Sequence, residues 1–396
     1  MQNKILQTYN FPMRAKRNLG TFNTHHMEPD AQAIFFHYAG VNAVDNHAYP
    51  ELEFIKEECA AFFLALFNAD HPDDYHHFTT SGSSESVFLA MLTLKKQHQR
   101  LHSQEAFKPN MIIGENSHIA WYKAARYLDI ELRIAPLNPL SLTMDTRCVM
   151  ALIDAHTLGV CGTLGAPTTL LCDDIKDLNQ QLAAHYQTTG QFIPIHVDAA
   201  SGGLVMPFVS PDIPFDFRLN HVVSLNVSSH KYGLVYPSLG WLFMRYTPCL
   251  ADLLDESEYL GTSIKRFSMQ FSHAASHLMT QYYYIQTLGR AGYQSIMQDL
   301  FHLANQLKQS LIQTQNNLWC LESPQKSLPG LVFSIGNKET AKLSARLKEK
   351  NWYLPVYSLP GTSAHQQVAR VVIRYGYDEA LINALTLEMQ EHFEYC

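Results

Sequence analysis

The sequence predicts an α/β protein in which a large domain with a mainly parallel sheet precedes a smaller α/β domain. From about residue 51 to residue 245, short apolar runs alternate with amphipathic helical stretches, which is the pattern of successive βαβ units. After a long helical stretch the pattern restarts as strand, helix and strand. With 396 residues, of which 46% are hydrophobic, the chain is long enough to bury a core in each of two lobes.

The first fifty residues are rich in Asn, His and Pro and carry no regular hydrophobic period, so we expect residues 1–50 to form an arm. Helical spacing begins at Leu52 and continues to Phe67, with the apolar residues on one broad face. We therefore place the large domain at residues 51–280 and the small domain at residues 281–396.

Within the large domain, the short apolar runs predict strands and the stretches between them predict helices. The expected strands are Met111–Ile113, Val149–Ile153, Phe192–Val197 and Val222–Val227. The expected helices between them include Ala120–Leu128 and Ile175–Tyr186. There follow a long helical stretch, a strand, a helix and a last strand, at Ala274–Thr314 (interrupted at Gly289 and Gly292), Leu331–Ile335, Thr340–Lys350 and Val368–Arg374.

Composition excludes several classes of function. The 36 acidic and 29 basic residues give a formal charge of −7, and no long basic run interrupts this balance. A surface for nucleic acid or for an anionic membrane is therefore not expected. No segment approaches the about 20 apolar residues of a membrane-spanning helix, and the N-terminus lacks the apolar run of a signal peptide, so we expect a soluble protein.

The cysteines and histidines suggest neither a disulfide framework nor a metal site. The seven cysteines are scattered and form no Cys-x-x-Cys pair, which fits a reducing, cytoplasmic setting. The paired histidines His25–His26 and His76–His77, and His71 nearby, have no well-spaced set of acids or thiols beside them. We interpret them as surface or loop residues and expect no metal.

The candidate chemistry lies on three loops next to predicted strands. Asp198 ends a buried strand and is followed by small residues that leave room for a flat ligand, although an Asp that caps a turn would fit equally. Lys231, beside His230, closes the next strand, either as a surface lysine or as a desolvated Schiff-base amine. The loop Thr79–Glu85 places hydroxyls and a glycine at a helix N-terminus, which caps the helix and also suits a phosphate group.

Together the three loops match the needs of pyridoxal 5′-phosphate, which requires a lysine, an acid at its pyridine nitrogen and a phosphate site. On these residues the sequence resembles the group II pyridoxal-phosphate decarboxylases, most closely the bacterial glutamate decarboxylases, from about Arg17 to Tyr377. The most specific motifs occur in order as His196-Val-Asp-Ala-Ala-Ser-Gly-Gly, Asp216-Phe-Arg-Leu and Ser229-His-Lys-Tyr-Gly-Leu. The resemblance implies pyridoxal-phosphate fold type I, the aspartate aminotransferase-like fold.

By this resemblance Lys231 would bind the cofactor covalently and Asp198 would pair with the protonated pyridine nitrogen. His118 would stack on the ring, placed to return a proton, and Ala200 would pack on the opposite face. The resemblance assigns phosphate contacts to Ser83, Ser84, Ser228 and His230.

Two further positions follow from the same resemblance. Ser272 would reach the phosphate bound by the neighbouring subunit, which implies a homodimer or a larger homo-oligomer with shared active sites. The family places a threonine near the phenolic oxygen of the cofactor, where this chain has Pro167, so Thr168 would take that role after a shift of one residue.

The substrate contacts are also implied by the resemblance. Arg370 would hold the α-carboxylate with its planar guanidinium and so orient the bond to be broken, and Arg374 in the same strand is the rival candidate. The residues that would meet the distal carboxylate are Thr21, Phe22, Asn42 and Asp45. An Asp beside a carboxylate needs a shared proton, so binding should favour acidic pH. Without the resemblance, Asn and Asp at these positions are ordinary turn residues.

The implied activity is the decarboxylation of L-glutamate to 4-aminobutyrate and carbon dioxide. His118 stands where bacterial glutamate decarboxylases usually have Gln, which leaves open another acidic amino acid, histidine or an aromatic amino acid as substrate. An inactive cofactor-binding relative also stays open, as does a lyase for phosphorylated amino alcohols, although the lyase would want a basic pocket and usually a membrane anchor. Because the ends of this chain are short, the resemblance does not extend to an N-terminal helix bundle or to pH gating by a C-terminal tail.

Overall fold

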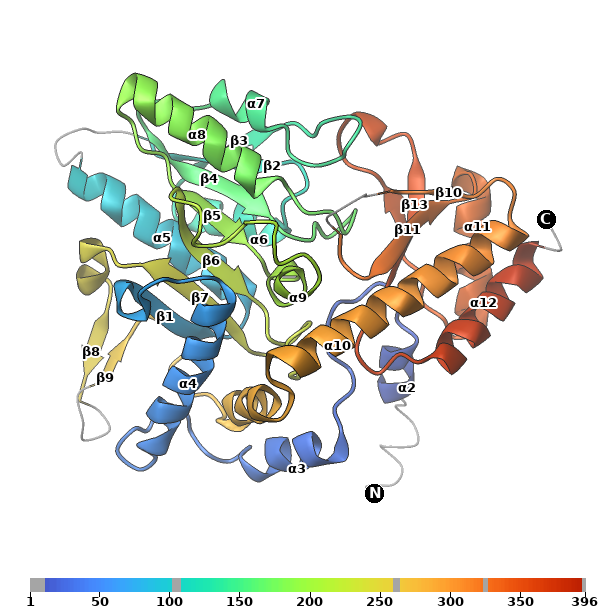
Figure 1. The fold of residues 1–396 in the computed structure, drawn as a ribbon, viewed down its shortest axis with the longest axis horizontal. Helices are drawn as coiled ribbons and strands as arrows, with labels where there is room; N and C mark the ends of the chain where they lie inside the picture. Colours follow the sequence, from blue (N-terminus) through green and yellow to red (C-terminus); the bar gives the residue numbers. More distant parts are fainter. Residues whose placement is uncertain (1–10, 102–107, 259–263, 323–326, 394–396) are drawn as a thin grey trace.

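The computed structural model describes residues 11–101, 108–258, 264–322 and 327–393. The first ten residues of the expected arm and the last three of the expected small domain therefore lie outside the described residues. Two separate sheets organise the described residues, one of seven strands and one of four, and the long helix α10 (Ser276–Thr314) runs from the larger part toward the smaller one (Figure 1).

The larger sheet is mainly parallel, as predicted. Its order is β1-β7-β6-β5-β4-β2-β3. The strands are β1 Tyr75–Thr80, β2 Asn110–Gly114, β3 Glu131–Ala135, β4 Thr157–Thr163, β5 Ile195–Asp198, β6 Val222–Val227 and β7 Gly240–Arg245. The neighbouring strands β3, β2, β4, β5 and β6 run parallel to one another. Strand β7 is antiparallel to both β6 and β1.

Helices cover both faces of this sheet, which explains why its strands read as continuous apolar runs. Successive side chains of a strand point to opposite faces. Accordingly Met111 and Ile113 of β2 pack with α5 (Ser83–Leu101) and α6 (Ile119–Tyr127), whereas Ile112 belongs to the core on the other face, which includes α8 (Ile175–Thr189).

One predicted strand is wrong. Residues 149–153 do not form a strand, because Val149 belongs to the short helix α7 (Thr146–Met150). The Asp145 side chain caps this helix by accepting a hydrogen bond from the Arg147 backbone amide at 3.1 Å. The strand at this point in the sheet is β4, a fully buried segment with two glycines. A short buried apolar run fits a helix as well as a strand, so periodicity alone could not separate the two.

The arm contains two short helices, α2 (Phe11–Lys16) and α3 (Pro29–His37), and it leads into α4 (Glu51–Leu66). Between α2 and α3 the chain runs along the smaller sheet, where the Leu19 carbonyl accepts a hydrogen bond from the Val372 amide at 2.7 Å. It then reaches the larger part, where the Thr24 amide donates to the His230 carbonyl at 2.8 Å. The arm therefore connects the two sheets.

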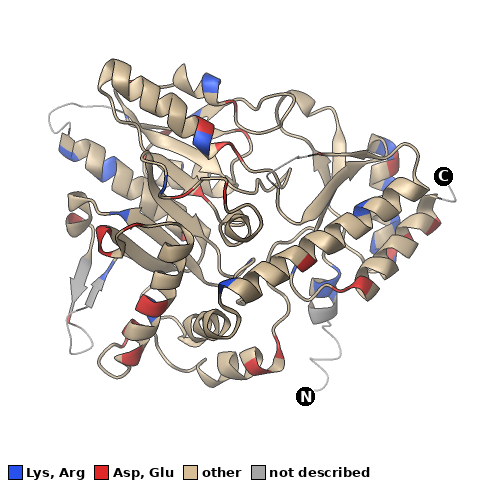
Figure 2. Cartoon of the chain, in the orientation of Figure 1, with Lys and Arg blue, Asp and Glu red and all other residues tan. Residues whose placement is uncertain are grey.

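The smaller part has the predicted strand, helix and strand. Its sheet is antiparallel in the order β10-β11-β13-β12, with strands β10 Trp319–Cys320, β11 Gly330–Ser334, β12 Val356–Ser358 and β13 Gln367–Val372. Helix α11 (Asn337–Glu349) packs against β13 and carries charges of both signs (Figure 2). Helix α12 (Glu379–Phe393) packs against α10 and α11, and its Glu residues are not accompanied by any Lys or Arg. Two ion pairs join α11 and its C-cap to α12: Arg346 with Glu391 at 3.7 Å, and Lys350 with Glu388 at 3.4 Å.

The remaining elements are short. In the described residues they are α9 Met206–Val209, a two-stranded ribbon of β8 Asp255–Ser257 and β9 Ile264–Arg266, and four 3-10 helices at Pro72–Asp74, Gly202–Leu204, Pro248–Asp252 and Gly361–Ser363. Among the described helices, none has both the length and the apolar stretch needed to cross a membrane.

Candidate active site

Three strands of the larger sheet end together and form one wall of a cavity. The last residue of β4, Thr163, is in register with Asp198 at the end of β5, and Asp198 is in register with Asn226 of β6. Ligands of α/β proteins commonly bind outside the carboxyl ends of such strands. The cavity here, which we call the lysine cavity, has a volume of about 270 Å³, and its lining includes Ser83, Ser84, His118, Asp198, Ala200, Ser228, His230 and Lys231.

Lys231 points its amine into this cavity. Its Nζ donates a hydrogen bond to the Ser201 hydroxyl at 3.0 Å and lies 5.3 Å from the centre of the Phe22 ring. Burial lowers the pKa of the Lys231 amine from 10.5 to about 8, with Asp198 opposing the shift and Arg370 adding to it. An amine with this pKa is neutral, and therefore nucleophilic, far more often than a surface lysine.

The Asp198 carboxylate is held by three donors. The Trp121 indole donates to Oδ2 at 2.9 Å, and the Asn226 amide and the Ala200 backbone amide donate to Oδ1 at 3.1 and 3.2 Å. Asp198 is 5% exposed, so these hydrogen bonds fix its position in a nearly dry environment. Asn226 was missed by the sequence analysis.

The buried His196, which lies on β5 together with Asp198, forms a hydrogen bond with Asn226 of β6. The two ring nitrogens of His196 pair with the Ser224 hydroxyl and the Asn226 side-chain oxygen, both at 2.7 Å. Burial lowers the pKa of His196, so its neutral form prevails, with Nε2 donating to Asn226 and Nδ1 accepting from Ser224. The alternation along β5 puts His196 on the same face as Asp198, which is the signal that could have found this role.

His118 is the N-cap of α6, and its Nδ1 accepts a hydrogen bond from the Ala120 backbone amide at 3.2 Å. Nε2 is therefore the ring nitrogen left free to hold a proton. Part of the side chain is exposed to solvent, yet partial burial lowers the pKa of His118, with Asp198 opposing the shift and Lys231 adding to it.

The loop Thr79–Glu85, which we call the serine loop, lies at the N-terminus of α5. The hydroxyls of Ser83 and Ser228 are 2.7 Å apart, and the Ser83 backbone amide faces the Ser228 oxygen at 3.4 Å. Gly82 allows the loop to lie against His230, since a Cβ at Gly82 would come 2.8 Å from the imidazole. Burial lowers the pKa of His230 to about 4, with Lys231 adding to the shift.

The arm passes beside the lysine cavity. Thr24 donates its hydroxyl to the Lys231 carbonyl at 2.7 Å, and Asn23 contributes to the cavity lining. The Phe22 ring lies 4.9 Å from the guanidinium carbon of Arg370. Neither Thr24 nor Asn23 was predicted from the sequence, although both adjoin the predicted pair Thr21 and Phe22.

The two candidate arginines lie in different surroundings. Arg370 donates to the Gly20 carbonyl, and its Nε is enclosed without a hydrogen-bond partner. Arg374 is 2% exposed and donates to three arm carbonyls, those of Ala15, Asn18 and Asn23. The Nε of Arg374 is likewise enclosed without a partner, but both of its terminal nitrogens hold the arm. Arg370 uses one terminal nitrogen on a single arm carbonyl and therefore has more donor capacity left.

Thr168 does not belong to the lining of the lysine cavity, whereas Pro167 and Thr163 do. The Thr168 carbonyl accepts a hydrogen bond from the Tyr357 hydroxyl, and its own hydroxyl is enclosed without a partner. The Thr168 hydroxyl therefore does not enter the cavity beside Pro167.

Thr21, Phe22 and Arg370 are also outside the lining of the lysine cavity, although Phe22 lies next to Lys231 and Arg370 next to Phe22. Three more predicted residues, Asn42, Asp45 and Ser272, make their contacts elsewhere. Asn42 forms a backbone bridge with Ala274, and its side-chain oxygen accepts from the His273 amide at 3.4 Å. Asp45 accepts from the Ala48 amide at 3.0 Å, as an Asx-type turn does, and Ser272 is exposed. One chain therefore does not bring these three residues to Lys231.

Within the described part of the chain, no group of three or more His, Cys, Asp or Glu side chains is arranged to hold a metal ion. His77 lies on β1 and pairs with Glu57, with 3.1 Å between Nε2 and the carboxylate, while His25 is half-buried with both ring nitrogens enclosed.

Comparison with known proteins finds relatives that match over most of the chain. The chain is 34% identical over 377 residues to glutamate decarboxylase 5 of Arabidopsis thaliana, which covers 93% of this chain and 76% of that protein. It is 33% identical over 392 residues to the glutamate decarboxylase of Lactococcus lactis subsp. cremoris, which covers 95% of this chain and 83% of that protein.

The fold is also similar to solved structures. A glutamate decarboxylase of Lactobacillus brevis superposes with a TM-score of 0.90 at 30% identity, covering 96% of this chain and 88% of that one. A sphingosine-1-phosphate lyase of Burkholderia pseudomallei shares the fold alone, with a TM-score of 0.83 at 19% identity over 100% of this chain and 89% of that one.

The family match covers most of the molecule, including the larger sheet, the serine loop, Asp198 and Lys231. Residues 20–335 match the conserved domain of the pyridoxal-dependent decarboxylases. The fold is accordingly fold type I, and the chain belongs to the family of pyridoxal-dependent decarboxylases, enzymes that use pyridoxal 5′-phosphate to remove a carboxyl group.

Proposed function

We propose that the protein decarboxylates L-glutamate to 4-aminobutyrate and carbon dioxide. The observation that carries this proposal is the meeting of Lys231, Asp198 and the serine loop in one cavity, in a chain whose full-length relatives include glutamate decarboxylases. The substrate is taken from these relatives and from the arm segment around Thr21.

The residues of the lysine cavity fit pyridoxal 5′-phosphate. The Ser83 and Ser228 hydroxyls converge at the N-terminus of a helix, which favours a phosphate group. Ser84 and His230 complete this phosphate site, and Ala200 and His118 would border the two faces of a flat ring. Thr168, which the resemblance assigns to the phenolic oxygen, is not among the residues that line the cavity.

When bound, pyridoxal 5′-phosphate supplies the electron sink that takes up the electron pair of the broken carbon–carbon bond. Lys231 would hold the cofactor covalently, because burial makes its amine nucleophilic near neutral pH. Asp198 would stabilise a proton on the pyridine nitrogen, since three donors fix the carboxylate and no Lys or Arg among the described residues forms an ion pair with it. His118 passes a proton through Nε2 to the carbon that loses the carboxylate.

Arg370 binds the α-carboxylate of the substrate. Its guanidinium lies beside the Phe22 and Tyr357 rings, 4.9 and 5.6 Å from their centres, and its enclosed Nε is a donor without a partner. A carboxylate held in one plane sets the direction of the bond to be broken, which favours decarboxylation over other reactions.

The active site is proposed to be shared between two subunits. Asn42, Asp45 and Ser272 gather around the Asn42–Ala274 bridge rather than around Lys231, and Ser272 is exposed. In a homodimer or a larger homo-oligomer, these residues would complete the lysine cavity of the neighbouring subunit. We also propose the division into the arm 1–50, the large domain 51–280 and the small domain 281–396, and a cytoplasmic location.

The proposed function predicts release of carbon dioxide and 4-aminobutyrate from glutamate between mildly acidic and neutral pH. A panel with aspartate, histidine and aromatic amino acids decides the substrate. Preference for one of these over glutamate would contradict the assignment, and no product from any of them would leave an inactive relative as the better description.

If the arm recognises the distal carboxylate, Thr21→Ala should lower kcat/KM for glutamate by about 10- to 100-fold, the value of a hydrogen bond to a charged group. Thr21→Ser keeps the hydroxyl and should retain most of the activity. An equal loss for all substrates in the panel would show that Thr21 only supports the fold.

The lowered pKa of Lys231 predicts the pH dependence of cofactor uptake by the apoprotein. Only the neutral amine attacks the aldehyde, so the rate should rise with pH, reach half its maximum near pH 8 and then level off. Stopped-flow absorbance after adding pyridoxal 5′-phosphate measures this rate, with a free lysine derivative as the reference for titration of the cofactor itself. A rate that continues to rise toward pH 10.5 would contradict the burial argument.

A further inference from the structure

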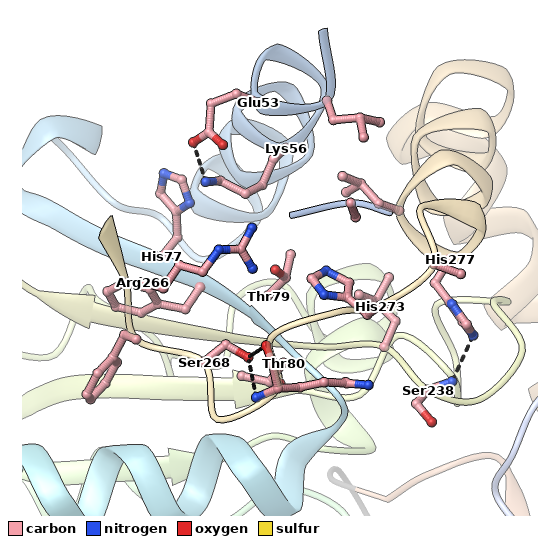
Figure 3. A pocket seen from close by; sticks show the side chains of 18 of the residues that line it. Glu53, Lys56, His77, Thr79, Thr80, Ser238, Arg266, Ser268, His273 and His277 are labelled. Carbon is pink, nitrogen blue, oxygen red and sulfur yellow. Dashed lines mark hydrogen bonds and ion pairs between the residues drawn. The ribbon is translucent and has the colours of Figure 1, made fainter. Parts of the chain in front are cut away.

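A second cavity, of about 450 Å³, lies on the other side of β1 from α5 (Figure 3). We call it the α4–β1 cavity, because its walls come from α4, β1 and the segment 266–278. Of the loops predicted to carry the chemistry, only the start of the Thr79–Glu85 loop lines it, through Thr79 and Thr80. Its lining combines a guanidinium, imidazoles and hydroxyls, from residues that include Arg266, His77, His273, Thr79 and Ser268.

Arg266 projects its guanidinium into this cavity, between His77 and Thr79 in the view of Figure 3. Its Nε is enclosed without a hydrogen-bond partner, and its described contact is with the Phe271 ring at 6.0 Å. Burial lowers the pKa of Arg266, with Glu53 opposing the shift. A guanidinium stays charged in proteins, so its partial desolvation is left without compensation.

Among the side chains that the structure describes, two carboxylates near Arg266 have other partners. Glu53 forms an ion pair with Lys56, and Glu57 pairs with His77. A buried or half-buried charge is normally paired. The described lining of the cavity therefore offers the Arg266 guanidinium, free volume and hydroxyl groups, together with the ion pair of Glu53 and Lys56.

We propose that the α4–β1 cavity binds a small oxyanion, with Arg266 as its principal ligand. The planar fork of a guanidinium matches both a carboxylate and a phosphate through two parallel hydrogen bonds. The Thr79 hydroxyl and the His273 imidazole, which face the same space in Figure 3, are in place to add further donors.

The wall of this cavity is joined to the serine loop by one carboxylate. Glu85, on α5, is 8% exposed. Its Oε1 accepts from the Ser268 hydroxyl at 2.9 Å and from the Met269 amide at 2.7 Å. Its Oε2 accepts from both the amide and the hydroxyl of Ser81, each at 2.7 Å.

A second contact makes the same connection. The Thr80 side chain lines the α4–β1 cavity, and its hydroxyl donates to the Gly82 carbonyl at 3.2 Å. An oxyanion that orders the segment 266–269 thus acts on the loop that holds the cofactor phosphate. Because coupling between two sites is reciprocal, the cofactor should strengthen anion binding by the same factor by which the anion strengthens cofactor binding.

Titration calorimetry on the holoenzyme at constant ionic strength tests the site, with inorganic phosphate in one arm and malonate in the other. Using the holoenzyme keeps the cofactor's own phosphate site filled. Arg266→Gln should weaken binding of the preferred probe by at least about tenfold, the effect of losing a two-pronged charged hydrogen bond. The control Arg147→Gln removes an arginine that is 76% exposed and should change binding less than about twofold.

Three results would overturn the site. They are the absence of saturable binding of both probes, equal affinity in wild type and Arg266→Gln, and a change of oligomeric mass in Arg266→Gln with no bound probe. The last result, seen by light scattering, would assign Arg266 to a contact between subunits. Stronger binding of phosphate than of malonate, or the reverse, identifies the class of oxyanion.

The connection through Glu85 has its own test. Release of the cofactor from the holoenzyme, followed by absorbance after dilution into a scavenger, should slow severalfold in the presence of the bound probe. This effect should vanish in Arg266→Gln. If the probe binds to the wild type and leaves the release rate unchanged, the connection is overturned, while the site itself stands. Because these readouts do not use turnover, they remain informative whatever the amino-acid substrate is.

Discussion

Replacing Lys231 with alanine is expected to lower kcat for glutamate by at least about a thousandfold, because the variant loses the covalent attachment of the cofactor. The amine is placed for this task by the strand end after β6 and by its hydrogen bond to Ser201. Carbon dioxide release measures the effect, and the absorbance of the bound cofactor shows whether the covalent link is absent.

The serine loop does not involve Lys231, so Lys231→Ala should still bind the cofactor without a covalent bond. Lys176→Ala, which removes an exposed lysine on α8, is the matched control and should keep the wild-type rate. A Lys231→Ala variant with a rate close to wild type, or with an unchanged cofactor spectrum, would remove Lys231 from the mechanism.

Replacing Asp198 with asparagine is expected to lower kcat by about 100-fold or more with little change in KM. The amide has the same size but no charge, so it no longer stabilises a proton on the pyridine nitrogen. The amide nitrogen would also face the donor groups of Trp121 and Asn226. Steady-state kinetics and the absorbance of the bound cofactor measure the change.

Two further variants separate charge from geometry at this position. Asp198→Glu keeps the charge and moves it by one methylene, so it should recover part of kcat if charge is the main term. Asp212→Asn removes an exposed carboxylate and should leave kcat unchanged. Equal kcat in Asp198→Asn and the wild type would contradict the electrostatic role.

Much of the lysine cavity could be predicted because its main residues lie where strands end. Asp198 and Lys231 each follow a buried apolar run, and parallel strands deliver their carboxyl ends to one edge of a sheet. The serine loop was equally visible, since hydroxyls and a glycine precede an amphipathic helix. Local pattern and spacing were enough for these residues.

The roles of the two arginines could not be separated from the sequence. Arg370 and Arg374 are four residues apart, and both could end up near a carboxylate. What distinguishes them is the arm, which comes from more than 300 residues away and occupies Arg374 with its carbonyls. Contacts between segments so distant in sequence leave no periodic signal.

The residues that donate hydrogen bonds to Asp198 could not be predicted from the sequence for the same reason. Asn226 and Trp121 lie 28 and 77 residues from Asp198, and within their own segments they read as a strand residue and a core aromatic residue. The strand predicted at residues 149–153 failed differently, because a buried helix and a buried strand are both short and apolar.

The way in which Arg374 holds the arm also bears on how substrate preference can evolve. Its guanidinium contacts the carbonyls of Ala15, Asn18 and Asn23, which every amino acid possesses. Substitutions along this stretch therefore leave the anchor intact while they change the groups presented beside Phe22. A lineage can exchange these side chains one at a time, and so explore new amino acids, without first losing the docked arm.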